Sequence, residues 1–189
     1  KNGWKQLSVN KLEETISLNA ASDIDFPFNF ALSENCSITD KGGSLYLAFF
    51  ENNWDLPAGH IELIIELKLV ISQVLEVFEN FIRFKVAQVK STKGMVEIKL
   101  NPPVGREFST IDSLVLNISE IDKNLTMKYL FSTRSLDMST GTMQTQKKIK
   151  EIDRVFNSKQ YLIYEQSLNQ DFIIESINSV VTEVKPKFM

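Results

Sequence analysis

The sequence predicts a mainly β, β-rich α+β fold: an antiparallel sandwich or barrel of about eight to ten strands, with roughly one to three packed helices. Short runs in which apolar and polar residues alternate recur along the chain, and turn-forming residues separate them. This pattern is typical of half-buried strands joined as hairpins. The chain has 189 residues, of which 43% are hydrophobic. That length supports a sizeable core, so we expect residues 1–189 to form a single domain.

The longest apolar run lies between residues 60 and 90, and we expect the fold to be organised around it. Its first part alternates from Ile61 to Ile71, which predicts a strand with Leu63, Ile65 and Leu67 in the core. From Ser72 the apolar residues recur at helical spacing. We therefore predict a short helix over residues 72–81 with Ser72 as its N-cap. The alternative is one long β-hairpin, since valine and isoleucine also suit strands.

Two hairpins are expected after this helix. The first covers residues 82–100 and turns at Ser91–Gly94, and the second covers residues 114–131 and turns at residues 120–124. Before the central run, a turn at residues 40–43 leads into a strand over residues 44–51. Alternating aromatic residues near Pro27 predict an edge strand, because proline cannot donate a ladder hydrogen bond.

The last third of the chain has a different pattern. Residues 132–142 are polar and predict a loop or a weakly specified edge. Apolar residues in the segment 147–156 recur at helical spacing, so we predict a helix there, followed by a strand near residues 161–165. The segment 170–185 predicts a C-terminal amphipathic helix with Asn169 or Asp171 as its cap and Pro186 as a stop. Its β-branched residues leave a pair of strands as the alternative.

Composition excludes several classes of function. The formal net charge of −3 argues against a dedicated nucleic-acid binder, which needs a surplus of lysine and arginine. One cysteine and one histidine exclude a structural zinc site within a single chain and an intrachain disulfide. No G-x-S-x-G, G-x-G-x-x-G or Walker A motif occurs. We therefore expect neither an enzyme nor a bound metal or cofactor. Charged residues interrupt the longest apolar run, so we expect no transmembrane segment.

Two surface features are candidates for binding. Phe49 and Phe50 are neighbours, so a strand places their rings on opposite faces and directs one of them away from the core. Together with Trp54 they are the predicted interface. A basic cluster near residue 150 has a plainer interpretation as the solvated face of a helix. The alternatives are an acidic partner, a membrane surface or nucleic acid. The cluster consists of Lys147, Lys148, Lys150 and Arg154.

These observations predict a non-catalytic structural or interaction protein that acts through its surfaces. We expect a homo-oligomer of the viral coat, matrix or surface-assembly type, whose interface includes part of residues 44–56. The alternative is a β-barrel carrier for an apolar or lipid-like ligand, closed by the C-terminal helix. A third hypothesis is an enzyme whose Asp and Glu residues meet only in the fold. Three glycosylation sequons occur, at Asn35, Asn117 and Asn124. The content of Asn, Ser and Thr predicts about as many by chance, so the sequons do not establish secretion.

Overall fold

The computed structural model divides the chain into two units, Lys1–Leu32 and Ser33–Met189. It describes residues 7–9, 20, 25, 29–33, 36–50, 59–92, 94–137, 144–164 and 166–185. The edge strand predicted near Pro27 falls largely outside these residues, and every helix and strand reported below lies in the second unit. A single domain over residues 1–189 stays a prediction.

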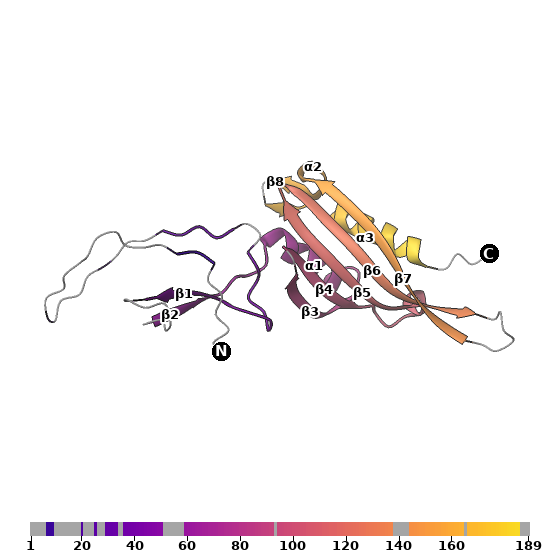
Figure 1. The fold of residues 1–189 in the computed structure, drawn as a ribbon. Coiled ribbons are helices and arrows are strands. Elements are labelled where there is room, and N and C mark those ends of the chain that lie inside the picture. The colour runs from indigo at the N-terminus through magenta and orange to yellow at the C-terminus, as the bar shows by residue number, and fades with distance from the viewer. Residues whose placement is uncertain are drawn as a thin grey trace. The chain divides into compact units, whose positions relative to one another are not determined.

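Five consecutive strands form the main sheet of the second unit (Figure 1). They are β3 (Lys85–Thr92), β4 (Met95–Asn101), β5 (Ile111–Ile121), β6 (Asn124–Asp137) and β7 (Gln144–Asn157). Each strand pairs antiparallel with the next, so the sheet is a meander in sequence order. The described residues contain nine strands and three α-helices in all. The predicted mainly β, antiparallel fold with a C-terminal helix is confirmed.

Both predicted hairpins are confirmed, and their turns show why they form. Gly94 adopts a φ of 79° in the β3–β4 turn, a conformation that glycine adopts without steric cost. Asp122 and Lys123 form the two-residue turn between β5 and β6, with φ values of 50° and 59°. Two positive φ values in succession are those of a type I′ turn, whose twist matches that of the flanking strands.

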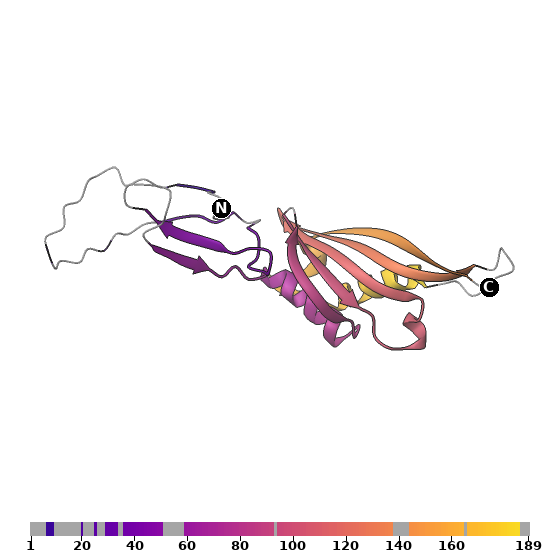
Figure 2. The same cartoon turned by 60° about the horizontal axis from the view of Figure 1, so that its bottom comes forward.

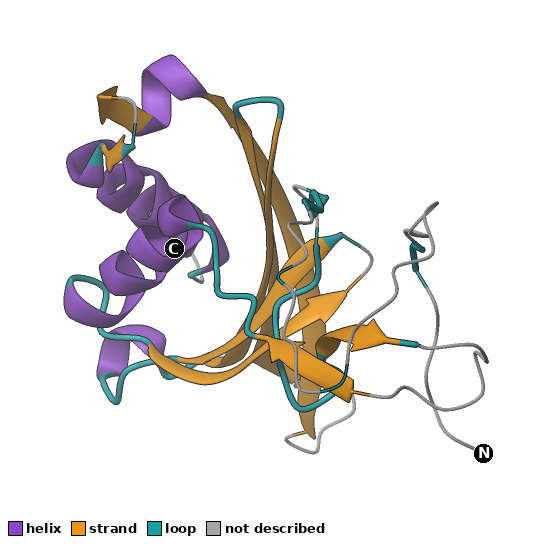
Figure 3. Cartoon of the chain, turned by 90° about the vertical axis from the view of Figure 1, so that its left-hand side faces the viewer, coloured by secondary structure: helices purple, strands orange, loops and turns teal. Residues whose placement is uncertain are grey.

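Helices α1 (Leu69–Asn80) and α3 (Gln170–Val184) lie on the same face of the main sheet (Figures 2 and 3). The predicted helices over residues 72–81 and 170–185 are therefore confirmed. The side chain of Asn169 caps α3 by accepting a hydrogen bond from Phe172 N. The predicted cap at Ser72 is wrong, because α1 begins three residues earlier and the Ser72 hydroxyl donates to Leu69 O within the helix.

The core lies between this helical layer and the inner face of the sheet. Alternate residues of the three central strands point toward the helices and are fully buried. They include Ile98, Leu100, Leu114, Leu116, Ile118, Leu125, Met127, Tyr129 and Phe131. Six residues of α1 and five of α3 are buried on the opposite side of this core. The period of two in the strands and 3.6 in the helices thus brings two apolar surfaces together.

The strand predicted over residues 61–71 is much shorter than expected. Among the described residues, strand β2 (Gly59–Leu63) pairs with β1 (Leu45–Phe49) alone, and residues 64–68 run on without a ladder before α1 begins. Leu63 and Ile65 are only half-buried, so their placement in the core is wrong, whereas the half-buried Leu67 packs against the core. Thr39 accepts from Ile65 N and donates to Ile65 O, but these single bonds do not make a ladder. Alternation alone does not tell a strand from an extended segment outside a ladder.

The helix predicted over residues 147–156 is also wrong, because this segment is the edge strand β7. It pairs in register with β6 from Asn124↔Asn157 to Asp137↔Gln144, so β6 also covers half of the segment predicted as a loop. Residues 138–143 lie outside the described part. Ile152 and Phe156 are buried, whereas Ile149 is 77% exposed. Short helix α2 (Ser158–Tyr161) and strands β8 (Leu162–Tyr164) and β9 (Ser167–Leu168) follow, and β8 confirms the predicted strand.

Candidate interaction surfaces

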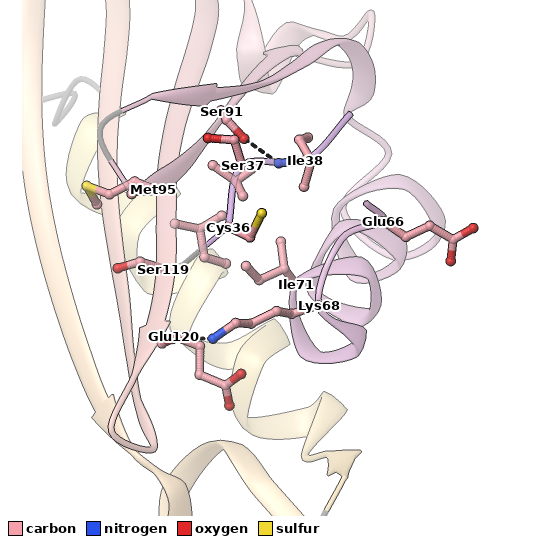
Figure 4. A pocket seen from close by; sticks show the side chains of 13 residues that line it. Cys36, Ser37, Ile38, Glu66, Lys68, Ile71, Ser91, Met95, Ser119 and Glu120 are labelled. Carbon is pink, nitrogen blue, oxygen red and sulfur yellow. Dashed lines mark hydrogen bonds between the residues drawn. The ribbon is translucent and has the colours of Figure 1, made fainter. Parts of the chain in front are cut away.

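A small hollow opens where residues 36–38 pass the beginning of α1 and the ends of β3, β4 and β5 (Figure 4). The space open to the centre of a water molecule is about 40 Å³, which accommodates water rather than a substrate. Ile38 N donates to Ser91 Oγ at 2.8 Å on one side of the hollow. Lys68 Nζ donates to the backbone oxygen of Glu120 at 2.7 Å on the other side. These contacts join neighbouring segments across the hollow.

The polar groups beside the hollow are paired in ways that support the fold. The buried Tyr161 hydroxyl donates to Glu120 Oε1 at 2.8 Å and so links α2 to the end of β5. Burial, followed by this hydrogen bond, raises the pKa of Tyr161 above its ordinary value. Cys36 is half-buried in the wall of the hollow. Within the described part of the chain, no three His, Cys, Asp or Glu residues are grouped as metal ligands would be.

The hairpin of β1 and β2 has one wholly apolar face. The cross-strand pairs Leu45↔Leu63 and Leu47↔Ile61 lie on this face, and Phe49 lies opposite Gly59. Phe49 is 44% exposed and Ile61 is 55% exposed. We call Leu45, Leu47, Phe49, Ile61 and Leu63 the apolar hairpin face. A strand sends alternate side chains to opposite sides, so Tyr46, Ala48, His60 and Glu62 form the other face.

The three residues of the predicted interface have different positions. Phe49 belongs to the apolar hairpin face, and Phe50 follows the end of β1 and is half-buried. Trp54 lies outside the described residues. The only histidine, His60, is exposed on β2 with its ring 5.6 Å from that of Tyr46 in an edge-to-face arrangement. The sequence predicted that the ring of Phe49 or Phe50 points away from the core, but it did not indicate that Ile61 shares a face with Phe49.

The predicted basic cluster is divided by strand alternation. Lys147 lies on the outer face of β7, whereas Lys148, Lys150 and Arg154 lie on the inner face, on the side of α3. Lys150 Nζ donates to the backbone oxygen of Glu183 in the last turn of α3, and Arg154 forms an ion pair with the Glu183 carboxylate. Cations near the C-terminus of a helix satisfy its terminal carbonyls and its dipole. Two members of the cluster therefore stabilise α3.

The two edges of the main sheet differ. At the β3 edge, Ser91 N donates to Asp40 Oδ2 at 3.0 Å, so the segment before β1 covers part of that strand. The backbone hydrogen bonds from Ser91 and Gly42 lower the pKa of Asp40 below its usual value. At the other edge, β7 has β6 as its single strand neighbour among the described residues. Because the sequence predicted a helix for this segment, it gave no indication of this edge.

Comparison of the chain with protein-family models, with curated proteins and with solved structures gives no match. None of the helices in the described residues has the length and apolar character needed to cross a membrane.

Proposed function

We propose that this chain is a non-catalytic interaction protein that self-associates through the apolar hairpin face as a component of a larger assembly. The observation that carries the proposal is the exposure of Phe49 and Ile61 on a face that has no polar side chain. A sheet with one apolar face is stabilised when a second layer covers that face. A two-stranded sheet is at best marginally stable in water, so covering this face also supports the hairpin itself.

A second copy of the chain suits this face. An isologous contact brings the same patch of both copies together, so the patch must complement itself. The apolar hairpin face carries no charge that would repel its own copy, and interface cores are likewise depleted in charge and enriched in aromatic residues such as Phe49. In such a contact Phe49 and Ile61 of both copies lose the surface that they expose in the monomer.

The carrier hypothesis receives less support. A pocket for a drug-sized apolar ligand has a volume of about 300–1,000 Å³, whereas the hollow beside Cys36 has about 40 Å³. Between the main sheet and α1, the space is filled by side chains such as Leu116, Tyr129 and Phe78, which have no exposed surface. Surface contact is therefore the function that the described geometry supports best.

Sedimentation velocity over a concentration series tests the proposal. We expect the wild-type chain to associate, and Phe49→Ser to weaken that association by about tenfold or more, because it removes a large apolar side chain from the contact. Tyr46→Ser is the matched control, since Tyr46 is an aromatic residue on the opposite face of β1. A wild-type chain that stays monomeric at every concentration would contradict the proposal, as would association that Phe49→Ser leaves unchanged.

A further inference from the structure

We infer that β7 is a second self-association surface, to which β7 of another copy pairs antiparallel and joins two five-stranded sheets into one. The inference rests on the proposed self-association and adds a second contact to it. A chain with two such two-fold contacts forms assemblies larger than a dimer.

The first observation is that β7 is a long and regular edge (Figure 1). It has 14 residues, includes neither proline nor glycine, and pairs with β6 without a bulge. Natural edge strands are commonly shortened, bulged or interrupted by proline to prevent pairing. Among the described residues, β7 makes no backbone-to-backbone hydrogen bond outside its ladder with β6, whereas residues 38–40 cover part of β3. One edge is thus partly covered and the other is available for a further strand.

The second observation is the order of charges along the outer face of β7. This face carries Lys147 toward one end, Glu151 and Asp153 toward the other end, and the 77% exposed Ile149 between them. Glu151 forms an ion pair with Lys128 of β6, so Asp153 is the acidic residue on which the pairing depends. Antiparallel pairing reverses the direction of the second strand, so the basic end of each copy meets the acidic end of the other. If lysines were the only charged residues on this face, they would discourage pairing with another strand. Asp153 on the same face makes it complementary to its own reversed copy.

A two-fold axis perpendicular to the sheet at Lys150 gives the register. Lys147 then lies opposite Asp153 of the second copy, and the symmetry repeats this pair. Ile149 lies directly opposite Glu151 of the second copy and diagonal to its own counterpart. The two Lys150 residues meet at the axis, but the Nζ of each donates to Glu183 O of its own α3.

An acidic peptide is a less suitable occupant of this edge. Such a peptide would face Lys147 favourably but would be repelled by Asp153 farther along the strand, whereas the Glu151 carboxylate is paired with Lys128. Opposite charges on directly facing residues stabilise a strand pair and like charges destabilise it. A second copy supplies acid and base in the required order.

A charge exchange in the Phe49→Ser background tests the inference by sedimentation velocity, because this background removes the proposed contact through the apolar hairpin face. We expect Phe49→Ser alone to form dimers. Adding Lys147→Glu or Asp153→Lys should weaken the dimer by about tenfold, because two symmetric pairs change from attraction to repulsion. Adding both changes together should restore it. Lys99→Glu is the control, since Lys99 is exposed on the outer face of the interior strand β4.

The outcomes separate the two proposals. A Phe49→Ser chain that is monomeric at every concentration overturns the inference about β7 and leaves the proposed function intact, provided that the wild type associates. Dimers that respond equally to Lys147→Glu and Lys99→Glu, or that the double exchange fails to restore, also overturn it. If the wild type and Phe49→Ser associate equally and the charge exchange weakens and restores both, the β7 contact is supported and the proposed apolar contact is wrong. A denaturant melt of each variant establishes that it is folded.

Discussion

Two isoleucines on β7 provide a matched test of the strand. Ile152 lies on the inner face and is 7% exposed, whereas Ile149 lies on the outer face and is 77% exposed. In the helix that the sequence predicted, both residues would lie on the same apolar face. The structure therefore predicts different effects for the same substitution at positions three residues apart.

The expected magnitudes follow from burial. Ile152→Ala removes the equivalent of about three buried methylene groups, each contributing about 0.8 kcal/mol, so the transfer loss is about 2.4 kcal/mol. Because an edge strand can relax around the space left, we expect a total loss of about 2–3 kcal/mol in the free energy of unfolding, at the lower end of the range for isoleucine. Ile149→Ala should change the free energy of unfolding by about 0.5 kcal/mol or less, since it changes an exposed side chain.

Urea denaturation followed by far-ultraviolet circular dichroism, at low protein concentration, measures both values. For each variant, the slope of the free energy of unfolding against urea concentration should match that of the wild type. A matching slope shows that the variant exposes as much surface on unfolding as the wild type does. Equal losses for the two variants would refute the assigned strand register and favour the helix instead. A larger loss for Ile149→Ala would place the outer face of β7 in the core.

Two further predictions concern polar contacts in the second unit. Tyr161→Phe should reduce the free energy of unfolding by about 0.5–1.5 kcal/mol, because it removes the hydrogen bond to Glu120, and a loss near zero in the same assay would show that this bond adds no stability. Asp40 has a lowered pKa in the folded state, so its contribution is present above the ordinary value of 3.8 and is lost as the pH falls through the lower folded-state value. In Asp40→Asn, the free energy of unfolding should therefore fall less steeply at acid pH than in the wild type. An unchanged fall would contradict this account.

Local patterns in the sequence determined much of the secondary structure. The hairpins followed from alternation on both sides of a turn, and residues such as Gly94 marked where the turn lies. The C-terminal helix followed from its apolar stripe and from the cap at Asn169. The mainly β class followed from the number of such runs. These features depend on neighbouring residues, so a single sequence contains them.

Where the apolar spacing of a segment suits both a helix and a strand, tertiary structure determines which of the two forms. Ile149, Ile152, Val155 and Phe156 suit a helix by spacing, but pairing with β6 makes the segment a strand and divides its basic residues between two faces. The strand predicted from Ile61 to Ile71 lost its second half for the converse reason, since β1 pairs with only its first residues. A strand is stabilised by hydrogen bonds to a partner remote in sequence, and local alternation does not identify that partner. The candidate surfaces depend on the same pairings: Ile61 joins Phe49 on one face, and β7 becomes an edge, only after the strands have found their neighbours.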